Sequence, residues 1–190
     1  MILKSAGNKG DFGAVMTKYG EVLGKTSSAS RMAEVSRRTG EAFSVVQPAY
    51  NYAALDTVIA VTNRHPTKEL VIHSLYTYSD TASLINVHLT TRPTTPAGTA
   101  LTAKPLNTRL NNTAAAALVE AYGDETGQAT QGTIIRVAVI AAEGELNIDI
   151  PQDVVRLSYN TYFGVDFVTV GALAGATIMC YFDDKQEDVD

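Results

Sequence analysis

The chain contains one cysteine, no tryptophan and three histidines among its 190 residues. The single cysteine, Cys180, cannot form an intramolecular disulfide, so we expect a reducing compartment or an assembly without disulfides. No apolar stretch reaches the length of a membrane-spanning helix, and the residues after Met1 lack the apolar segment of a signal peptide. We therefore expect no membrane partner. A chain of this length buries enough apolar surface to fold without disulfides or metal.

Charged residues are also scarce, at 18% of the chain, and the formal net charge is −5. This acidic balance argues against nucleic-acid binding by the chain as a whole. Residues 1–68 carry nine Lys or Arg and five Asp or Glu, a net of +4, whereas 69–190 carry six and fifteen, a net of −9. A basic leading segment before an acidic body predicts docking on an acidic partner, such as a neighbouring copy. Uneven surface charge without a function is the alternative.

Residue types that carry catalysis form no recognisable constellation. His73 and His88 fall on successive predicted strands, but a metal site needs three or four convergent ligands, and the nearest carboxylates lie at strand ends. The chain has no Gly-x-Ser-x-Gly elbow and no phosphate-binding loop of the Walker type. Cys180 belongs to an alternating apolar run, which indicates an inert core thiol. We predict no enzyme activity, no catalytic residues, no metal and no cofactor.

What the chain does have is a series of short β-type runs between about residues 41 and 182. Strands are predicted over 42–47, 54–62, 69–78, 83–90, 132–142, 145–150, 156–158, 161–170 and 175–182. In 83–90, Ile85, Val87 and Leu89 alternate with polar residues, as in a strand with one buried face. Eight or nine such strands predict an all-β, two-sheet jelly-roll-like sandwich.

The segments between these runs carry further predictions. Pro48 should end the first strand, and 91–112 should be a long polar connection without regular pairing that contacts a partner. The alanine-rich stretch 113–122 has helical propensity, but the surrounding β pattern favours a strand, which we prefer. A turn should follow at 123–127. Glu143-Gly144 predicts a tight turn that joins 132–142 to 145–150 as a hairpin.

The chain divides by composition into an N-terminal arm (1–40), a β-sandwich domain (41–182) and an acidic tail (183–190). The arm is rich in glycine and short of apolar residues, so we expect it to lie on the body or on a partner. One short helix could begin at Ser30 and end at Gly40. The candidate partner-binding residues are the basic residues of the arm: Lys4, Lys9, Lys18, Lys25, Arg31, Arg37 and Arg38.

Several short stretches follow one another in a characteristic order. They are YGEVL (19–23), GEAFSV (40–45), VTN (61–63), KELVI (68–72), LTAKPLN (101–107), NNTAA (111–115), GDETG (123–127), QGT (131–133) and YFGVDF (162–167). This order resembles that of small virion proteins of tailed bacteriophages, over roughly residues 19–182. The chain departs from the pattern at Ala103-Lys104, where proline is common, and at Leu110 after a displaced Arg109. Both departures fall in the loop.

The resemblance implies a β-sandwich on the virion surface that commonly forms a homotrimer. It implies a capsid decoration or auxiliary head protein, assembled in the host cytoplasm, that docks on a major capsid or tail protein through its N-terminal arm. A tail, fibre or baseplate adaptor is the first alternative. A receptor- or glycan-binding jelly-roll module that uses loop 91–112 is the second. A cupin-like enzyme is disfavoured, because the chain lacks the necessary histidines and carboxylates.

Overall fold

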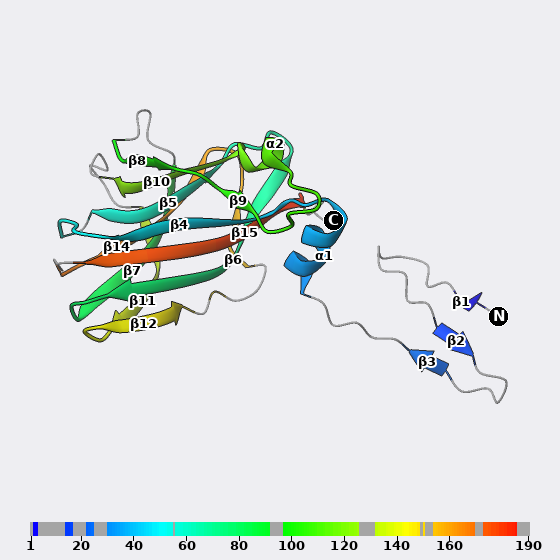
Figure 1. Cartoon of the computed structure of the whole chain (residues 1–190), viewed down its shortest axis with the longest axis horizontal. Coiled ribbons are helices and arrows are strands. Elements are labelled where there is room, and N and C mark those ends of the chain that lie inside the picture. The colour runs from blue at the N-terminus through cyan, green and yellow to red at the C-terminus, as the bar shows by residue number, and fades with distance from the viewer. Residues whose placement is uncertain are drawn as a thin grey trace. The chain divides into compact units, whose positions relative to one another are not determined.

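The computed structural model describes residues 2–3, 14–16, 22–24, 30–54, 56–91, 97–125, 132–148, 150, 154–169 and 173–185, the first three stretches as backbone only (Figure 1). The chain divides into two compact units, Met1–Arg31 and Met32–Asp190. In the first unit, three short strands form an antiparallel sheet in the order β1-β2-β3. These are β1 (Ile2–Leu3), β2 (Ala14–Met16) and β3 (Val22–Gly24).

The second unit is a sandwich of two antiparallel sheets. Its strands are β4 (Ala42–Tyr50), β5 (Thr57–Asn63), β6 (Lys68–Ser79), β7 (Ser83–Thr91), β8 (Thr99–Leu101), β9 (Lys104–Pro105), β10 (Val119–Glu125), β11 (Thr133–Ile140), β12 (Gly144–Ile148), β13 (Arg156–Leu157), β14 (Thr161–Phe167) and β15 (Ala174–Asp184). One sheet, here called the β14 sheet, has the order β11-β7-β14-β5-β10-β8. The other, the β15 sheet, has the order β12-β6-β15-β4-β9, and β13 pairs with β6.

Eight of these strands follow jelly-roll topology. Strands β4, β6, β12 and β15 lie in one sheet, and β5, β7, β11 and β14 lie in the other. Two interlocking Greek keys produce this distribution. The predicted all-β sandwich is therefore confirmed, and the remaining short strands add to the edges of the two sheets.

The core lies between the two sheets and is built from apolar side chains of both. Phe43 and Phe182 pack edge to face with their ring centroids 5.6 Å apart, and both are buried. Ile85 and Val87 are buried, as the alternation in 83–90 predicts. Full burial of each side chain of this size contributes on the order of 1.5–3 kcal/mol to stability.

Pro48 does not end the first strand, because β4 continues through it to Tyr50. Opposite Pro48, the register of β15 shifts between Ala174 and Ala176, so two residues of β4 face one residue of β15. A proline is tolerated at such a bulge, because no ladder hydrogen bond requires its missing N–H. The proline therefore marks an irregularity inside a strand.

Residues 91–112 were predicted as an unpaired loop and 113–122 as a strand. The structure instead has two short strands and a short helix before β10. Within 91–112, β8 and β9 pair with β10 and β4 at the sheet edges. Residues 113–122 begin as a short helix, α2 (Thr113–Ala116), before β10 starts. Asn112 caps α2 by accepting a hydrogen bond from the N–H of Ala115 at 3.0 Å. The predicted turn at 123–127 is also wrong in part, because β10 runs to Glu125.

Strands β11 and β12 do not form the predicted hairpin. The turn is present, since Glu143 has a φ of 52° and the N–H of Gly144 bonds to the carbonyl oxygen of Ala141. The two strands that it joins belong to different sheets, however, since β11 pairs with β7 and β12 pairs with β6. The turn thus carries the chain from one layer of the sandwich to the other.

A short helix, α1 (Arg31–Arg38), precedes β4 as predicted, and Gly40 follows it with a φ of +70°. Its buried residue Val35 packs in a cluster with Ala42, Val71 and Tyr181. Two asparagines of the 91–112 connection bind the end of α1: Asn107 donates to the carbonyl of Ser36 and Asn112 donates to that of Thr39. The first unit ends at Arg31, which is the first residue of this helix.

The tail predicted to begin at residue 183 starts later, because β15 extends to Asp184. The Asp183 carboxylate accepts a hydrogen bond from Arg156 at 2.9 Å. This ion pair links β13 to the end of β15.

Candidate interaction surface

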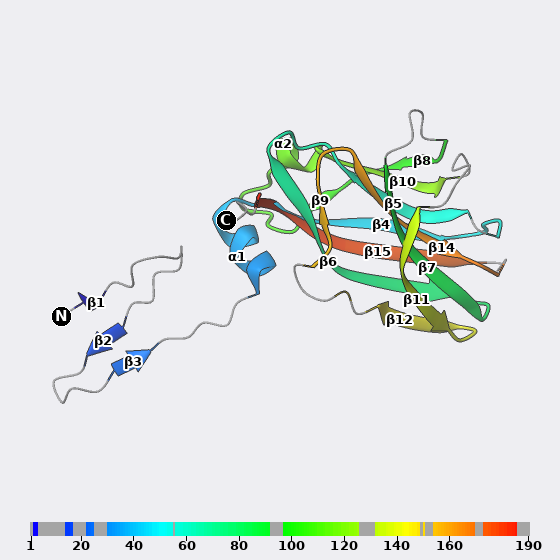
Figure 2. The same cartoon turned by 180° about the vertical axis from the view of Figure 1, so that it is seen from behind.

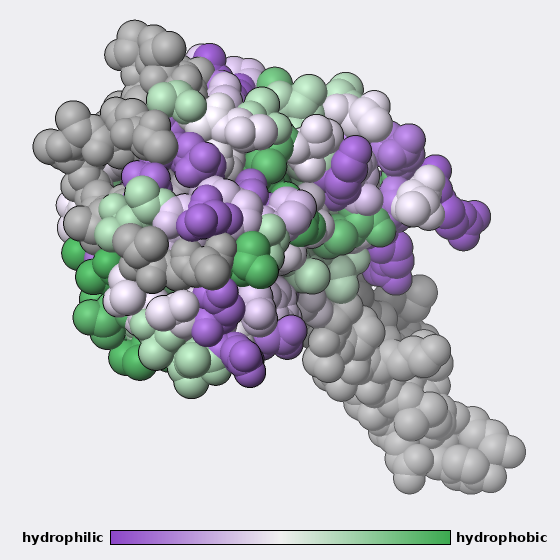
Figure 3. Space-filling view, turned by 60° about the vertical axis from the view of Figure 1, so that its left-hand side comes forward, coloured by the Kyte–Doolittle hydropathy of each residue, from purple (hydrophilic) through white to green (hydrophobic). Residues whose placement is uncertain are grey.

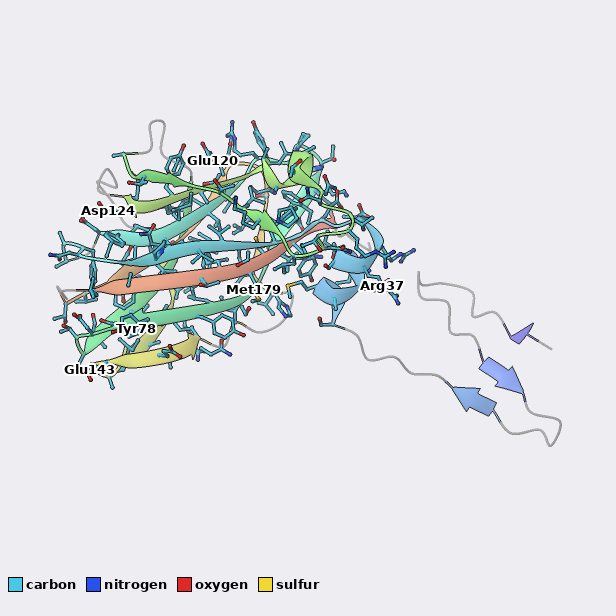
Figure 4. All side chains as sticks on the ribbon, viewed as in Figure 1. Arg37, Tyr78, Glu120, Asp124, Glu143 and Met179 are labelled. Atoms are coloured by element: carbon cyan, nitrogen blue, oxygen red, sulfur yellow. The ribbon has the colours of Figure 1, made fainter. Side chains whose placement is uncertain are left out.

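Of the basic residues proposed for partner binding, three lie in the described part of the chain. Arg31, Arg37 and Arg38 are exposed on α1, and Lys4, Lys9, Lys18 and Lys25 lie outside the described residues. Arg38 bonds to Glu34 at 2.9 Å, one helical turn earlier. Figure 4 shows Arg37 directed away from the body. The helix thus groups three guanidinium groups on a solvated face, where one exposed ion pair adds little stability.

The histidines do not converge on a site. His73 lies on β6 in the β15 sheet, whereas His88 lies on β7 in the β14 sheet. His65 bonds through Nδ1 to the backbone N–H groups of Thr67 and Lys68 and so stabilises a turn. Across the described residues, no group of three or more His, Cys, Asp or Glu side chains is placed to hold a metal ion.

A buried polar cluster that was not predicted lies on the β14 sheet. His88 Nε2 lies 3.1 Å from both carboxylate oxygens of Asp166, and Thr57 Oγ1 donates to the same carboxylate at 2.7 Å. The Tyr162 ring lies beside the imidazole, with centroids 6.0 Å apart. Across the strands His88 pairs with Gly164, and Asp166 follows two residues later on the same face.

This cluster contains the residue types of a catalytic His–Asp pair, but its side chains are not accessible to solvent. His88 and Asp166 have no exposed surface, and Thr57 and Tyr162 are 1% exposed. Burial raises the pKa of the Tyr162 hydroxyl well above its usual range. A substrate cannot reach groups that are closed off in this way, so the cluster stabilises the pairing of β5, β7 and β14.

Cys180 is likewise closed off. It lies on β15 with no exposed surface, and burial raises the pKa of its thiol to about 12. The thiolate is the reactive form of cysteine, so this thiol is inert in the folded protein. The prediction of a core cysteine is confirmed.

The segment proposed as a glycan-binding loop forms one wall of an open groove of about 690 Å³. The opposite wall is α2 and the start of β10. The groove is lined mainly by small side chains, and among its polar residues are Arg64, Lys104, Glu120 and Tyr122. The exposed tyrosines Tyr76 and Tyr159 lie elsewhere, so the groove lacks the row of aromatic side chains that favours sugar binding.

The most unusual exposed surface follows the edge strand β11. Four of its eight residues are exposed β-branched aliphatic side chains, and Leu84 on β7 adjoins them. We call these five residues the β11 strip. Their exposed fractions are 48% for Ile134, 42% for Ile135, 54% for Val137, 71% for Val139 and 45% for Leu84.

Figure 2 shows β11 along one margin of the body beside β7. Figure 3 shows hydrophobic side chains gathered on the lower left of the body. An exposed, long, apolar edge strand is a site for association with another chain.

No family model, curated protein or solved structure matches this chain. In the described part, the structure also has no helix long and apolar enough to cross a membrane.

The sequence of β11 contains an indication of this exposed apolar surface. The run TIIRVAVIAA (133–142) has one charged residue and no strict alternation of polar and apolar positions. A strand covered on both faces produces such a run, and so does a strand that meets a partner. Only the sheet order, which places β11 at an edge, separates the two cases.

Proposed function

We propose that this protein is a non-enzymatic structural subunit of a bacteriophage virion. Within that class, we propose a capsid decoration or auxiliary head protein. The order of short motifs along the chain supports the virion placement, and the jelly-roll body is compatible with it. Because a jelly roll serves many functions, the fold alone does not select this one.

The β11 strip is the observation that carries the proposal of an assembling subunit. Its four β-branched residues are exposed on a strand at the edge of a sheet. A protein that works alone in solution gains nothing from such a surface and risks aggregation through it. The polar clusters of the described body, by contrast, are buried or engaged in ion pairs. In this proposal the protein therefore acts by binding other chains through its surfaces and not by chemical catalysis.

The N-terminal arm (1–40) is proposed to supply the contact with the particle. Residues 1–40 carry seven Lys or Arg and three Asp or Glu, a net of +4, against eight and seventeen in 41–190, a net of −9. A tethered basic segment combined with contacts of the body gives a higher net affinity than either alone. Copies of the chain, in the homotrimer that the resemblance implies, would multiply these contacts.

The proposal is tested with particles purified from a culture that expresses the gene. Mass spectrometry should detect the full chain in the particle fraction, and an antibody against the body should label heads in electron micrographs. Labelling of tails would favour the tail, fibre or baseplate adaptor. Absence of the chain from purified particles would contradict the virion role. Light scattering of the isolated protein tests the homotrimer, and a dimer would contradict that part of the proposal while leaving the virion role open.

A further inference from the structure

The β11 strip faces outward from the β14 sheet. Ile85 and Val87 of β7 point into the core, so their neighbours Leu84 and Asn86 point outward. Val139 pairs with Leu84 and Val137 pairs with Asn86, and directly opposed residues share a face. Val139, Val137 and Leu84 therefore form one apolar surface on the outer side of the sheet.

The strand also has a free edge. β11 is the terminal strand of the β14 sheet and pairs only with β7 among the strands that the structure describes. Half of its backbone N–H and C=O groups point to the side away from β7, because these groups alternate along a strand. An added strand would meet both a hydrogen-bonding edge and an apolar face.

The charges on the body favour this edge for the approach of a second copy. Residues 41–190 carry a net charge of −9, the sum of eight basic and seventeen acidic residues, so two bodies repel each other over most of their surfaces. Within 133–142 the only charged residue is Arg136, which is positive. β11 therefore carries none of the acidic groups that make two bodies repel each other.

The sequence of β11 is self-complementary in an antiparallel pair. The register with β7 shifts between Ile134 and Arg136, so the regular part of the strand is 136–140. A two-fold axis at Ala138 places Val137 opposite Val139 of the second copy and Arg136 opposite its Ile140. Paired β-branched side chains stabilise adjacent strands.

The arginines disfavour registers with the axis closer to Arg136 than Ala138. With the axis at Ala138, the two Arg136 Cα atoms are offset by four residues, or about 14 Å along the strands. This distance exceeds the Debye length of about 8–10 Å at ordinary ionic strength, so their repulsion is screened. An axis at Val137 would halve the offset, and an axis at Arg136 would place the two charges directly opposite each other.

We infer that β11 pairs antiparallel with β11 of a second copy about a two-fold axis at Ala138. The pairing joins two β14 sheets into one continuous sheet and places Val137 and Val139 of each copy beside those of the other. It names the partner for the β11 strip, rests on the proposed function for its biological purpose, and gives a dimer in place of the homotrimer that the resemblance implies. The geometry of the pairing is inferred only from strands that the structure describes.

Light scattering of the full chain over a range of concentrations is the first test. A mass of twice 20.3 kDa is expected at high concentration. Val139→Lys should raise the dissociation constant at least about tenfold, because it removes two symmetry-related pairs and places a charge on the paired apolar face. Val46→Lys is the matched control, since Val46 is 49% exposed on β4 of the other sheet and should leave dimerisation unchanged.

Crosslinking tests the register without relying on a destabilising variant. Oxidation of Ala138→Cys should give a covalent dimer, since the two residues are directly opposed and the native Cys180 is buried. Val46→Cys should give none. A monomer at all concentrations, a trimer, or equal crosslinking of the two variants would overturn the pairing. A dimer that is absent from particles would contradict the virion role and leave the pairing intact.

Discussion

Gly164 lies directly opposite His88 in the paired strands β14 and β7, and the imidazole ring covers it. A Cβ atom on Gly164 would come within 2.6 Å of two atoms of that ring and 2.8 Å of the Tyr162 ring. The glycine therefore provides the space in which the buried histidine sits. Its lack of a side chain at this position matters more than its backbone freedom.

Gly164→Ala should destabilise the protein by about 1–3 kcal/mol, the usual cost of overpacking a rigid interior. Urea denaturation followed by circular dichroism measures the change. The double variant Gly164→Ala with His88→Ala is the control. Its loss should be smaller than the sum of the two single losses, because the added methyl group then has room. Additive losses would show that the imidazole does not cause the clash.

Asp166→Ala should cost about 1–3 kcal/mol of stability for each buried polar group that loses its partner. The substitution removes the carboxylate that accepts from Thr57 and faces His88, and it leaves both polar groups buried without their partner. Asp166→Asn should cost less, since the amide oxygen still accepts from the threonine. Thermal unfolding of the three proteins measures the order. Equal stability of the alanine and asparagine variants would contradict the assigned hydrogen bonds.

Glu125→Ala should loosen the start of the segment that leads to β8. The buried Glu125 carboxylate accepts hydrogen bonds from the N–H groups of Ala97 at 2.7 Å and Gly98 at 3.1 Å. Loss of both leaves two backbone donors without this acceptor, and because Ala97 is exposed and Gly98 partly exposed, the cost is about 0.5–1.5 kcal/mol for each hydrogen bond. Hydrogen exchange at 97–101 should speed up, while exchange in β15 should stay unchanged. The same rates in the variant and the parent would count against this anchoring role.

Stability should fall as the pH rises above about 9. Burial raises the pKa of the Cys180 thiol from 9.0 in an exposed setting to about 12 in the folded protein. A group whose folded pKa is raised contributes stability that is present below the unfolded pKa and is lost as pH rises toward the folded pKa. Between pH 9 and 12 this group lowers the unfolding free energy by up to about 1.4 kcal/mol per pH unit.

Cys180→Ala isolates that contribution, because the cavity it leaves has the same effect at every pH. Urea titrations at pH 8, 9.5 and 11 should show a shallower loss of stability in the variant than in the parent. Parallel pH profiles would contradict the assignment. In the folded parent at pH 8, a thiol reagent should label Cys180 only after denaturant is added.

The sequence predicts the features that depend on local pattern. The order of β runs, the alternation of Ile85 and Val87, the inert Cys180 and the helix before Gly40 all follow from residues a few positions apart. The jelly-roll class follows from the number and spacing of the runs. These properties are set within each strand or turn, so one sequence is enough to read them.

Features that depend on distant pairing could not be predicted in the same way. His88 and Asp166 are 78 residues apart, and nothing near either of them signals the other. Residues 113–122 contain both a helical and a strand preference, and the division between α2 and β10 depends on pairing with β5. The turn at Glu143 is evident locally, yet only the complete sheet order shows that it joins two layers.

The two margins of the β14 sheet are unequal. At one margin lies β11, with eight residues, and at the other lies β8, with three. So short a strand offers little for a further chain to join. Association through the long margin therefore closes after two bodies and gives a finite unit instead of a fibre. Such a unit would combine two bodies of net charge −9 with two leading segments of net charge +4.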